Sequence, residues 1–316
     1  MQQRTMGRTG LFVSSLGLGT LTWGRDTTAD DAEQMWTMFA DAGGTVIDTS
    51  PAYGDGQAQP VIGSILGRVI PRDETILVST GGWSRVDGQQ MLSNSRHALL
   101  ATLDRTLSEL GTDYLDVFLV SRRDPHTPFD ETLSAIDIAV RSGRVRYAGV
   151  SNHSSWDTAT LCALSHGLPG AIAVTESEYS LLARQVEVDL LPGVREAGLG
   201  FFAWSALARG VLSGKYRHST PPDSRAASPL LAGFVTPYLT ERCQRIVEGL
   251  AVAAEGLDRT IADVALGWIQ HRPGVSCALI GPRSPLQLAQ LLDGGGEPLP
   301  PAINQALDDI SVSSLH

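Results

Sequence analysis

Short apolar segments alternate with longer amphipathic segments along this chain, and this alternation constrains the fold more than any other feature. The short segments have the length and β-branched content of buried strands, and the longer ones have helical spacing. Strands separated by helices pair in parallel through right-handed crossovers. Eight such units close into a (β/α)8 TIM barrel. We expect the strands at residues 15–19, 45–48, 76–79, 114–120, 147–150, 171–174, 200–204 and 277–280.

The remaining segments complete this plan. Residues 4–13 predict a small N-terminal β-hairpin, residues 81–90 a glycine-rich loop, and the stretch after residue 204 a long loop to about residue 238. Helices are expected at residues 28–42, 57–69, 91–110, 128–142, 156–165, 188–197, 241–255, 260–271 and 285–292.

A doubly wound open sheet is the alternative fold. That fold usually has a G-x-G-x-x-G turn after its first strand, and Gly17, Gly19 and Gly24 do not form one. No linker, low-complexity segment or repeat divides the chain. We therefore expect residues 1–316 to form a single barrel domain.

Composition excludes several classes of function. The net charge of −10 argues against general binding of nucleic acid or of an anionic membrane, although one basic pocket for a phosphate is still allowed. Cys162, Cys243 and Cys277 are far apart and fit reduced thiols in a cytoplasm. No signal peptide, membrane span or metal-ligand motif is evident. We expect a cytoplasmic protein without a bound metal, whose oligomeric state stays open.

The expected strand at residues 45–48 carries the first candidate site. Asp48 ends this strand, Pro51 and Gly54 impose a turn, and Tyr53 lies in that turn. In parallel α/β folds the C-terminal ends of strands are where chemistry is placed. Asp48 and Tyr53 are therefore candidate catalytic residues. On spacing alone, an acid that caps the next helix and a tyrosine packed on a loop are an equally good explanation.

Several motifs together resemble those of the aldo-keto reductase family, and the resemblance runs nearly end to end. Members of that family fold as (β/α)8 barrels, bind NADPH at the C-terminal mouth, and usually reduce aldehydes and ketones. The resemblance therefore implies NADP(H) as cofactor and a small-molecule substrate. The motifs that carry it are Met6–Leu11, Leu16–Thr20, Asp48–Gly54, Gly149–Asn152 and Trp204–Lys215.

The same resemblance implies a set of cofactor-binding residues. Ser151 and Asn152 would contact the nicotinamide carboxamide, and Trp204 would lie against the ring. Backbone amides between residues 205 and 210 would hold the pyrophosphate, which agrees with the general use of glycine-rich turns as anion sites. The full expected set is Gly19, Thr20, Asp48, Ser151, Asn152, Glu176, Trp204, Ser205, Leu207, Gly210, Lys215, Arg225, Gly281, Arg283, Gln287 and Gln290.

Arg283 would lie at the adenosine end of the cofactor. A guanidinium matches phosphate oxygens well, so an arginine there suits the 2′-phosphate of NADP(H). An ordinary surface arginine is the alternative explanation for this residue.

The sequence departs from the family pattern where the chemistry is done. The family uses Asp, Tyr, Lys and His, and only Asp48 and Tyr53 match. Gly81 is expected at the lysine position and Ser121 at the histidine position, and Glu176 stands where a glutamine is usual. Near the adenine, the family's Glu and Asn are replaced by Gln290 and Leu291. We expect Asp48, Tyr53 and Ser121 to be the catalytic residues that remain.

These replacements weaken the proton-donating apparatus. The family's lysine lowers the pKa of the tyrosine, so without it we expect Tyr53 to keep a pKa near its ordinary value of about 10. Loss of one oxyanion donor typically costs ~10²–10³ in rate. Lys215 is the only lysine in the chain and is expected at the cofactor, while Arg85 is a less favoured substitute.

Three functions follow from this pattern. The first is an NADP(H)-dependent oxidoreductase acting on an imine, an iminium or an unusual carbonyl, because a cationic C=N bond would neutralise Asp48 and needs no proton donor. The second is a non-redox dehydratase, lyase, isomerase or cyclase in which Asp48 is the base and Tyr53 the acid. The third is an inactive NADP(H)-binding protein.

Four other side chains are ambiguous on sequence alone. His126 lies in the loop after the fourth strand and could face a substrate, although a solvent-exposed histidine is favoured. Trp23, Trp83 and Phe234 could line an apolar pocket or pack in the core.

Overall fold

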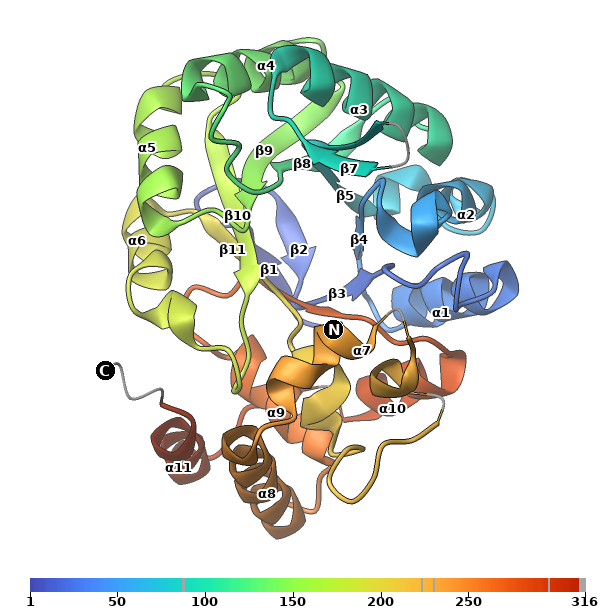
Figure 1. The fold of residues 1–316 in the computed structure, drawn as a ribbon, viewed down its shortest axis with the longest axis vertical. Coiled ribbons are helices and arrows are strands. Elements are labelled where there is room, and N and C mark those ends of the chain that lie inside the picture. The colour runs from blue at the N-terminus through green and yellow to red at the C-terminus, as the bar shows by residue number, and fades with distance from the viewer. Residues whose placement is uncertain (87–88, 223, 230, 295, 313–316) are drawn as a thin grey trace.

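The barrel predicted from the sequence is confirmed. The computed structural model describes residues 1–86, 89–222, 224–229, 231–294 and 296–312. Eight parallel strands pair in chain order and the last pairs with the first, so the sheet closes, with helices arranged around it (Figure 1). The strands are β3 (Leu16–Gly19), β4 (Val46–Thr49), β5 (Ile76–Gly81), β8 (Leu115–Val120), β9 (Val145–Ser151), β10 (Ile172–Glu178), β11 (Gly200–Trp204) and β12 (Cys277–Ile280).

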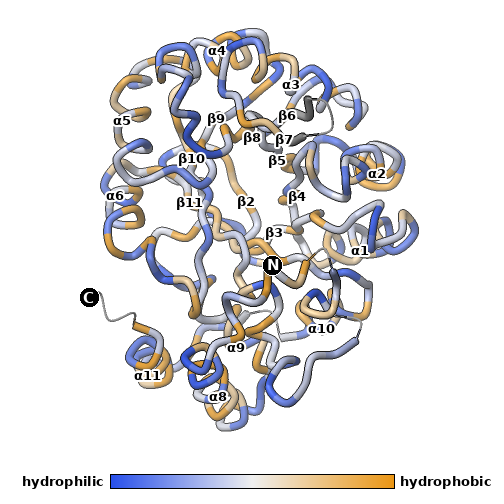
Figure 2. Tube along the Cα trace, in the orientation of Figure 1, coloured by the Kyte–Doolittle hydropathy of each residue, from blue (hydrophilic) through white to orange (hydrophobic). Residues whose placement is uncertain are grey.

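Amphipathic helices cover the outside of the barrel. Polar and apolar residues alternate along them (Figure 2), as in α1, where Met35, Trp36 and Phe39 are buried. Thr28 caps this helix by accepting a hydrogen bond from the amide of Asp31, which satisfies a free donor of the first turn. The helices are α1 (Ala29–Asp41), α2 (Ala58–Ile65), α3 (Arg96–Leu110), α4 (Phe129–Arg141), α5 (Ser155–Ser165), α6 (Leu190–Ala197), α7 (Ala232–Val235), α8 (Glu241–Gly256), α9 (Ile261–Gln270), α10 (Pro285–Asp293) and α11 (Pro301–Ser311).

The inside of the barrel is apolar at one end and polar at the other. Val46, Val78 and Phe202 belong to a buried cluster within the barrel. Met6 and Val13, from the predicted N-terminal hairpin β1 (Gln3–Thr5) and β2 (Phe12–Ser14), join the same cluster. The hairpin lies against Gly200, the first residue of β11, and so closes the N-terminal end of the barrel. The cavity that opens at the C-terminal mouth, by contrast, is lined by polar side chains such as Asp48, Ser121 and Glu176.

The expected glycine-rich loop after β5 is instead a β-hairpin. Strands β6 (Trp83–Val86) and β7 (Gln89–Leu92) pair antiparallel, and residues 87 and 88 of the expected loop lie outside the described residues. The helix expected from residue 91 begins only at Arg96, because Ser95 is its N-cap and accepts a hydrogen bond from the amide of Ala98. The Asp-Gly pair at residues 87–88 is typical of two-residue hairpins and is the signal that identifies this one.

Two further helix expectations were wrong. Helix α2 ends at Ile65 rather than near residue 69, because Gly67 has a φ of 73° and the chain turns there. Helix α11 was not expected, although Pro301 at its first position favours a helix start. The long segment after β11 contains short 3₁₀ turns and α7. Within the described part of the chain, no helix is both long enough and apolar enough to span a bilayer.

Candidate functional site

A cavity of about 800 Å³ opens at the C-terminal mouth of the barrel. All but one of the residues expected to bind substrate or cofactor line it. The exception is Thr20, which is fully buried. Its amide and hydroxyl both donate to the carbonyl oxygen of Asp48, at 3.0 and 2.9 Å. Thr20 therefore fixes the end of β4 and does not itself face the mouth.

The turn after β4 aims Tyr53 into this cavity. Gly54 has a φ of 58°, and a Cβ atom there would lie 1.9 Å from the carbonyl oxygen of Trp23. Only glycine fits this close approach, and the Gly54 amide donates to the carbonyl of Leu21 at 2.9 Å. The turn is thereby held against the loop after β3. Asp48 and Tyr53 consequently line one cavity, as expected from the sequence.

Two carboxyl groups are buried together at the base of the mouth. Asp48 and Glu176 are each 4% exposed. Oδ1 of Asp48 and Oε2 of Glu176 have no hydrogen-bond partner among the described residues. Neither acid forms an ion pair with a described Lys, Arg or His. Burial of charge without a counter-ion is costly, so this pair favours either a bound cation or a retained proton.

The titration of the site follows from this burial. Burial raises the pKa of Glu176 to about 7. Burial, and then the charge of Glu176, raises the pKa of Asp48 well above its ordinary value. Burial and the two acids also raise the pKa of Tyr53. The expectation that Tyr53 keeps an ordinary pKa was wrong, because it neglected both desolvation and the neighbouring negative charges.

The inward-facing residue at the end of β5 is Thr80, not Gly81. Thr80 lines the cavity and its hydroxyl donates to Oγ of Ser50 at 2.8 Å. A Cβ atom on Gly81 would instead lie 2.3 Å from the ring of Phe118, outside the barrel. The motif assigned the missing lysine to Gly81, whereas the alternation of side chains along β5 gives the mouth position to Thr80.

Ser121 and Arg85 are the other residues that the sequence suggested near the positions of the missing histidine and lysine. Ser121 lines the cavity just beyond β8, and its amide donates to the carbonyl of Gly81 at 2.9 Å. The backbone of Arg85 pairs with that of Gln90 in the β6–β7 hairpin, and its side chain lies outside the described residues. No amine or imidazole among the described side chains bonds to Asp48 or Tyr53 in the way the family's lysine would.

A chain of hydrogen bonds links four expected cofactor residues. Trp204 Nε1 donates to Oδ1 of Asn152 at 2.8 Å, and Asn152 Nδ2 donates to Oγ of Ser151 at 2.9 Å. Ser151 Oγ then donates to Oε1 of Glu176 at 2.9 Å. Every donor in the chain points toward Glu176. The carboxyl group is therefore fixed through Oε1, while Oε2 is buried without a hydrogen-bond partner among the described residues.

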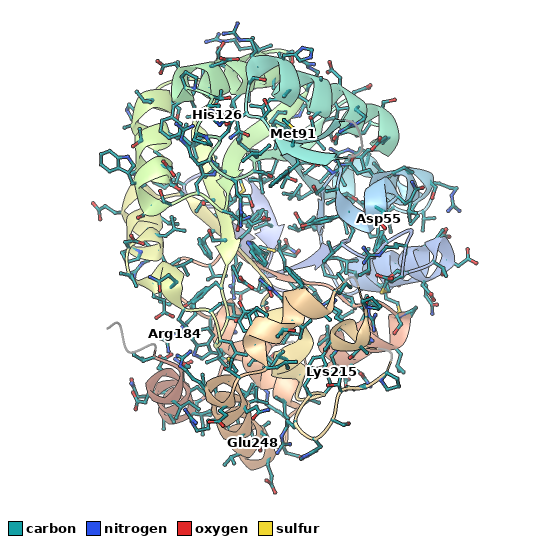
Figure 3. The ribbon with its side chains drawn as sticks, viewed as in Figure 1. Asp55, Met91, His126, Arg184, Lys215 and Glu248 are labelled. Carbon is teal, nitrogen blue, oxygen red and sulfur yellow. The ribbon has the colours of Figure 1, made fainter. Side chains whose placement is uncertain are left out.

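The segment after β11 forms a tight turn beside the cavity. Residues 205, 208, 209 and 210 all have positive φ values, between 45° and 95°. The amides of Ala208 and Gly210 donate to the carbonyls of Ser205 and Leu207, and the amide of Arg209 donates to Oγ of Ser205, so these three donors are used within the turn. Lys215 lies beside this turn, since a Cβ atom on Gly210 would be 3.0 Å from its Nζ. Figure 3 shows Lys215 in the half of the molecule that holds α8, α9 and α10.

A pair of arginines lies farther along the same wall. Arg225 Nη2 donates to the carbonyl of Gly281 at 2.7 Å, and its Nε is buried without a partner among the described residues. Burial, and then the charge of Arg283, lowers the pKa of Arg225 to about 10. Gln287 accepts a hydrogen bond from the amide of Arg283 at 3.0 Å. Two crowded guanidinium groups with a free donor fit a phosphate such as the one on the adenosine ribose of NADP(H).

Arg209 is a further residue of the mouth that sequence reasoning missed. Its Nη2 atom donates to both carboxylate oxygens of Glu178, at 2.9 and 3.0 Å. Its guanidinium carbon lies 3.6 Å from the centre of the Phe234 ring, and Nη1 donates to the carbonyl of Phe234. The sequence signal for Arg209 was Glu178, a second acid on the same face of β10 as Glu176, because a partly buried acid favours a cationic partner.

Of the four side chains that were ambiguous on sequence alone, two line the cavity and two do not. Trp83 and Phe234 line the cavity, and Trp23 is fully buried in the core. His126 is exposed and does not line the cavity; Figure 3 shows it near α4.

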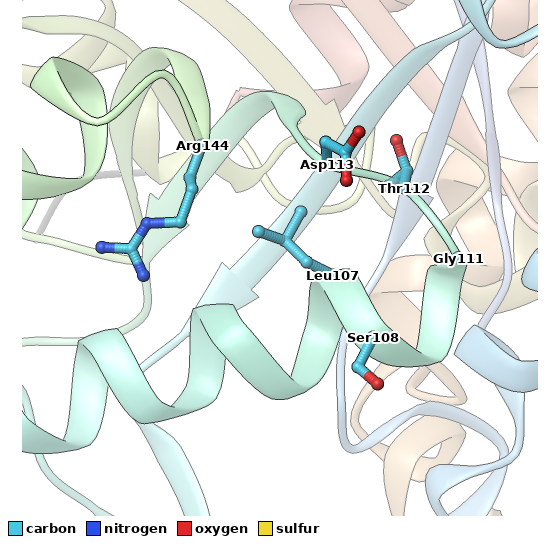
Figure 4. Close-up of a pocket in the computed structure, with 6 residues that line it drawn as sticks. All are labelled: Leu107, Ser108, Gly111, Thr112, Asp113 and Arg144. Carbon is cyan, nitrogen blue, oxygen red and sulfur yellow. The ribbon is translucent and has the colours of Figure 1, made fainter.

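A second hollow, of about 480 Å³, lies where α3 ends and the chain enters β8, away from the mouth (Figure 4).

The described residues contain no group of three or more His, Cys, Asp or Glu side chains placed to hold a metal ion. The site is thus a barrel mouth with a wall that carries Lys215, Arg225 and Arg283, a line of amide and hydroxyl groups, and two buried acids. A sequence model of the aldo/keto reductase family matches residues 15–312, which is nearly the whole chain. The chain therefore belongs to the aldo/keto reductase family.

Proposed function

We propose that this protein is an NADP(H)-dependent oxidoreductase that reduces a cationic C=N bond. Its family makes it an oxidoreductase that works with a nicotinamide cofactor. The choice of NADP(H) is supported by Arg225 and Arg283, whose crowded positive charges fit a ribose phosphate. When bound, the reduced nicotinamide supplies a hydride at the mouth.

The observation that carries the choice of substrate is the buried pair of Asp48 and Glu176. Each has one buried oxygen without a described partner, and no described cation pairs with either. A substrate with a positive charge would provide the missing counter-ion. A neutral ketone would bring its developing negative oxygen toward two acids, which opposes reduction.

The chemistry of an iminium also matches the missing proton donors. When an iminium carbon accepts a hydride, the π electrons of the C=N bond become the lone pair of the nitrogen. The product is a neutral amine, and no proton has to be delivered. Tyr53 holds its proton more tightly than usual, because its pKa is raised, so it is a poor acid for a ketone.

The side chains around the pair have defined tasks in this proposal. Asp48 and Glu176 stabilise the charge on nitrogen, while Ser121 and Thr80 offer hydroxyl groups. Trp83, from the β6–β7 hairpin, and Phe234 form apolar walls that exclude water from the reacting carbon. We therefore expect a cyclic or otherwise hydrophobic iminium.

The test compares two substrates of equal shape. Purified protein and NADPH are mixed with an N-methylated cyclic iminium, whose charge does not depend on pH, or with the corresponding cyclic ketone. We expect oxidation of NADPH with the iminium and little with the ketone. Asp48→Asn should lower the rate with the iminium by at least about tenfold, because it removes one charge from the site. Equal rates with both substrates, or no turnover of the iminium, would overturn the proposal.

A second candidate is favoured by one observation. Asp48 and Tyr53 line one cavity, and the raised pKa of Asp48 suits a general base that accepts a proton near neutral pH, as a dehydratase or an isomerase requires. In that case a carbonyl or alcohol substrate would be converted without a net change in NADPH. If the protein binds NADPH tightly but shows neither iminium reduction nor non-redox turnover, this result would instead support an inactive NADP(H)-binding protein.

A further inference from the structure

The two buried acids also face the part of the mouth where the cofactor changes its charge. The nicotinamide ring is neutral when reduced and carries one positive charge when oxidised. We propose that the Asp48–Glu176 pair makes the mouth bind the oxidised cofactor more tightly than the reduced one, with a proton leaving the protein as the oxidised form binds. This inference rests on the proposed use of NADP(H), but not on the identity of the substrate.

Glu176 is fixed close to the expected position of the ring. The hydrogen-bond chain from Trp204 through Asn152 and Ser151 ends on its Oε1 atom. These three residues are the ones that the family resemblance assigns to the ring and its carboxamide. Glu176 lines the cavity, and its Oε2 atom is buried without a partner among the described residues. A glutamine at this position would offer the same shape without the charge.

None of the described charged or titratable groups around Asp48 and Glu176 supplies a positive charge to the pair. The nicotinamide ring would therefore be its counter-ion. Tyr53 follows β4, and Cys277 on β12 has a pKa raised by burial and by both acids, so neither supplies a positive charge. Glu178, farther along β10, is already paired with Arg209. Arg4 acts on Cys277 from the closed N-terminal end of the barrel. Among the described residues, no cation forms an ion pair with either of the two acids.

The proton follows from the same arrangement. In the cofactor-free protein, two buried acids whose charges interact cannot both ionise readily, so the pair retains a proton near neutral pH. A positive ring beside the pair favours the ionised form, and one carboxylic acid becomes a carboxylate as its proton passes to solvent. No bond to the cofactor forms and no electron moves in this binding step.

This inference fits the proposed reaction. The mouth holds a cationic substrate with a neutral reduced cofactor before hydride transfer, and a neutral amine with a cationic oxidised cofactor afterwards. The pair therefore faces one positive charge at both stages. The same two side chains would stabilise each state.

Titration calorimetry tests the inference on the intact protein. NADP+ and NADPH are titrated separately at pH 7, each in two buffers that differ in their enthalpy of ionisation. We expect NADP+ to bind about tenfold more tightly than NADPH, as one added charge interaction of this kind would produce. We also expect release of up to one proton with NADP+ and almost none with NADPH.

Two variants and a matched control locate the effect. Glu176→Gln should bring the two affinities to within about twofold and abolish proton release, and Asp48→Asn should act in the same direction. Asp55→Asn removes an exposed acid that lies 3.7 Å from Arg25, at a φ of 55° that asparagine tolerates. This control should leave the affinity ratio unchanged.

The outcomes separate this inference from the proposed function. Equal affinities in the unaltered protein, or a preference that survives both Glu176→Gln and Asp48→Asn, would overturn the inference even if iminium reduction is observed. A preference for NADP+ without any iminium turnover would uphold the inference and overturn the proposed substrate. Failure of both dinucleotides to bind would overturn both.

Discussion

Among single residues, Glu176 is the clearest case of a charged side chain at a buried position where stability alone would favour a neutral one. The residue is 4% exposed, and among the described residues its carboxyl group forms a hydrogen bond only with the hydroxyl of Ser151, at 2.9 Å. An amide at this position would satisfy the same hydrogen bond at no electrostatic cost. Retention of a carboxyl group therefore indicates a task that needs the charge.

The first prediction concerns the pH dependence of stability. The pKa of Glu176 is about 7 in the folded protein and 4.5 in its ordinary state. The folded protein therefore holds this proton more tightly than the unfolded chain, and the resulting stability is present at low pH and lost as pH rises through 7. At pH 8 we expect the Glu176→Gln variant to be about 3 kcal/mol more stable than the unaltered protein, and at pH 5 this advantage should fall below about 1 kcal/mol.

Urea unfolding of the cofactor-free protein at pH 5 and pH 8 measures this difference. The matched control is Asp55→Asn, whose carboxyl group is exposed. Its stability should follow that of the unaltered protein at both pH values. A Glu176→Gln variant with an unchanged pH profile would show that the buried charge is compensated in some other way.

The second prediction concerns the missing lysine and histidine. Thr80→Lys places an amine in the mouth near Asp48, and Ser121→His restores an imidazole beyond β8. With both changes we expect reduction of a simple aldehyde by NADPH to rise by about 10²-fold, the usual scale of one such group. Gly81→Lys with Ser121→His is the matched control. A Cβ atom on Gly81 would meet Phe118, so we expect this control to lose stability and gain no activity.

Part of this residue-level picture was accessible from the sequence. Motif resemblance predicted that Asp48, Tyr53 and the expected cofactor residues lie around one mouth, and all of them except Thr20 line one cavity, because short motifs carry the residue type and its approximate place. It could not decide between Thr80 and Gly81, because one position along a strand reverses the direction of a side chain. It also missed Arg209, whose partners Glu178 and Phe234 are 31 and 25 residues away in the chain.

At the level of elements, one side of the mouth is closed by the segment that carries α7. Arg209 connects β10 to this segment, because it binds Glu178 on one side and Phe234 on the other. Its side chain is 12% exposed, and that of Glu178 is 23% exposed. An ion pair this well shielded from water contributes more to the free energy of unfolding than an ion pair at the surface does.

The third prediction tests this connection. Arg209→Ala removes the ion pair and the contact with Phe234, and leaves Glu178 partly buried without a counter-ion. We expect a loss of about 2–3 kcal/mol in unfolding free energy, together with faster proteolysis within residues 224–238. Arg217→Ala breaks a pair with Glu248, whose side chain is 52% exposed, and should cost clearly less stability than Arg209→Ala. Equal losses in the two variants would contradict the role given to Arg209.

Elements were predicted well wherever a single periodic signal decided them. The barrel strands and the outer helices have such a signal, and their expected ranges agree closely with the structure. The β6–β7 hairpin was missed because a glycine-rich stretch was taken for a loop, although it brings Trp83 to the mouth. Helix α11 follows the last strand, where the barrel pattern no longer indicates what comes next.

Considered as a whole, the molecule separates stability from chemistry along the barrel axis. The hairpin β1–β2 and an apolar cluster fill the N-terminal end, so the polar groups of the mouth rest on a packed base. The chain is acidic overall, with a net charge of −10, yet Lys215, Arg225 and Arg283 gather along one wall of the mouth. That wall suits a phosphorylated cofactor, and the opposite charge of Asp48 and Glu176 suits a positive centre.

The most direct test of this account is transfer of a labelled hydride. NADPH deuterated at its transferable position is incubated with the N-methylated cyclic iminium, and the product is analysed by mass spectrometry. The account predicts one deuterium, bound to the former iminium carbon of the amine, in the unaltered protein and far less product with Asp48→Asn. Amine formed without deuterium, or no amine at all while the labelled cofactor is bound, would contradict it.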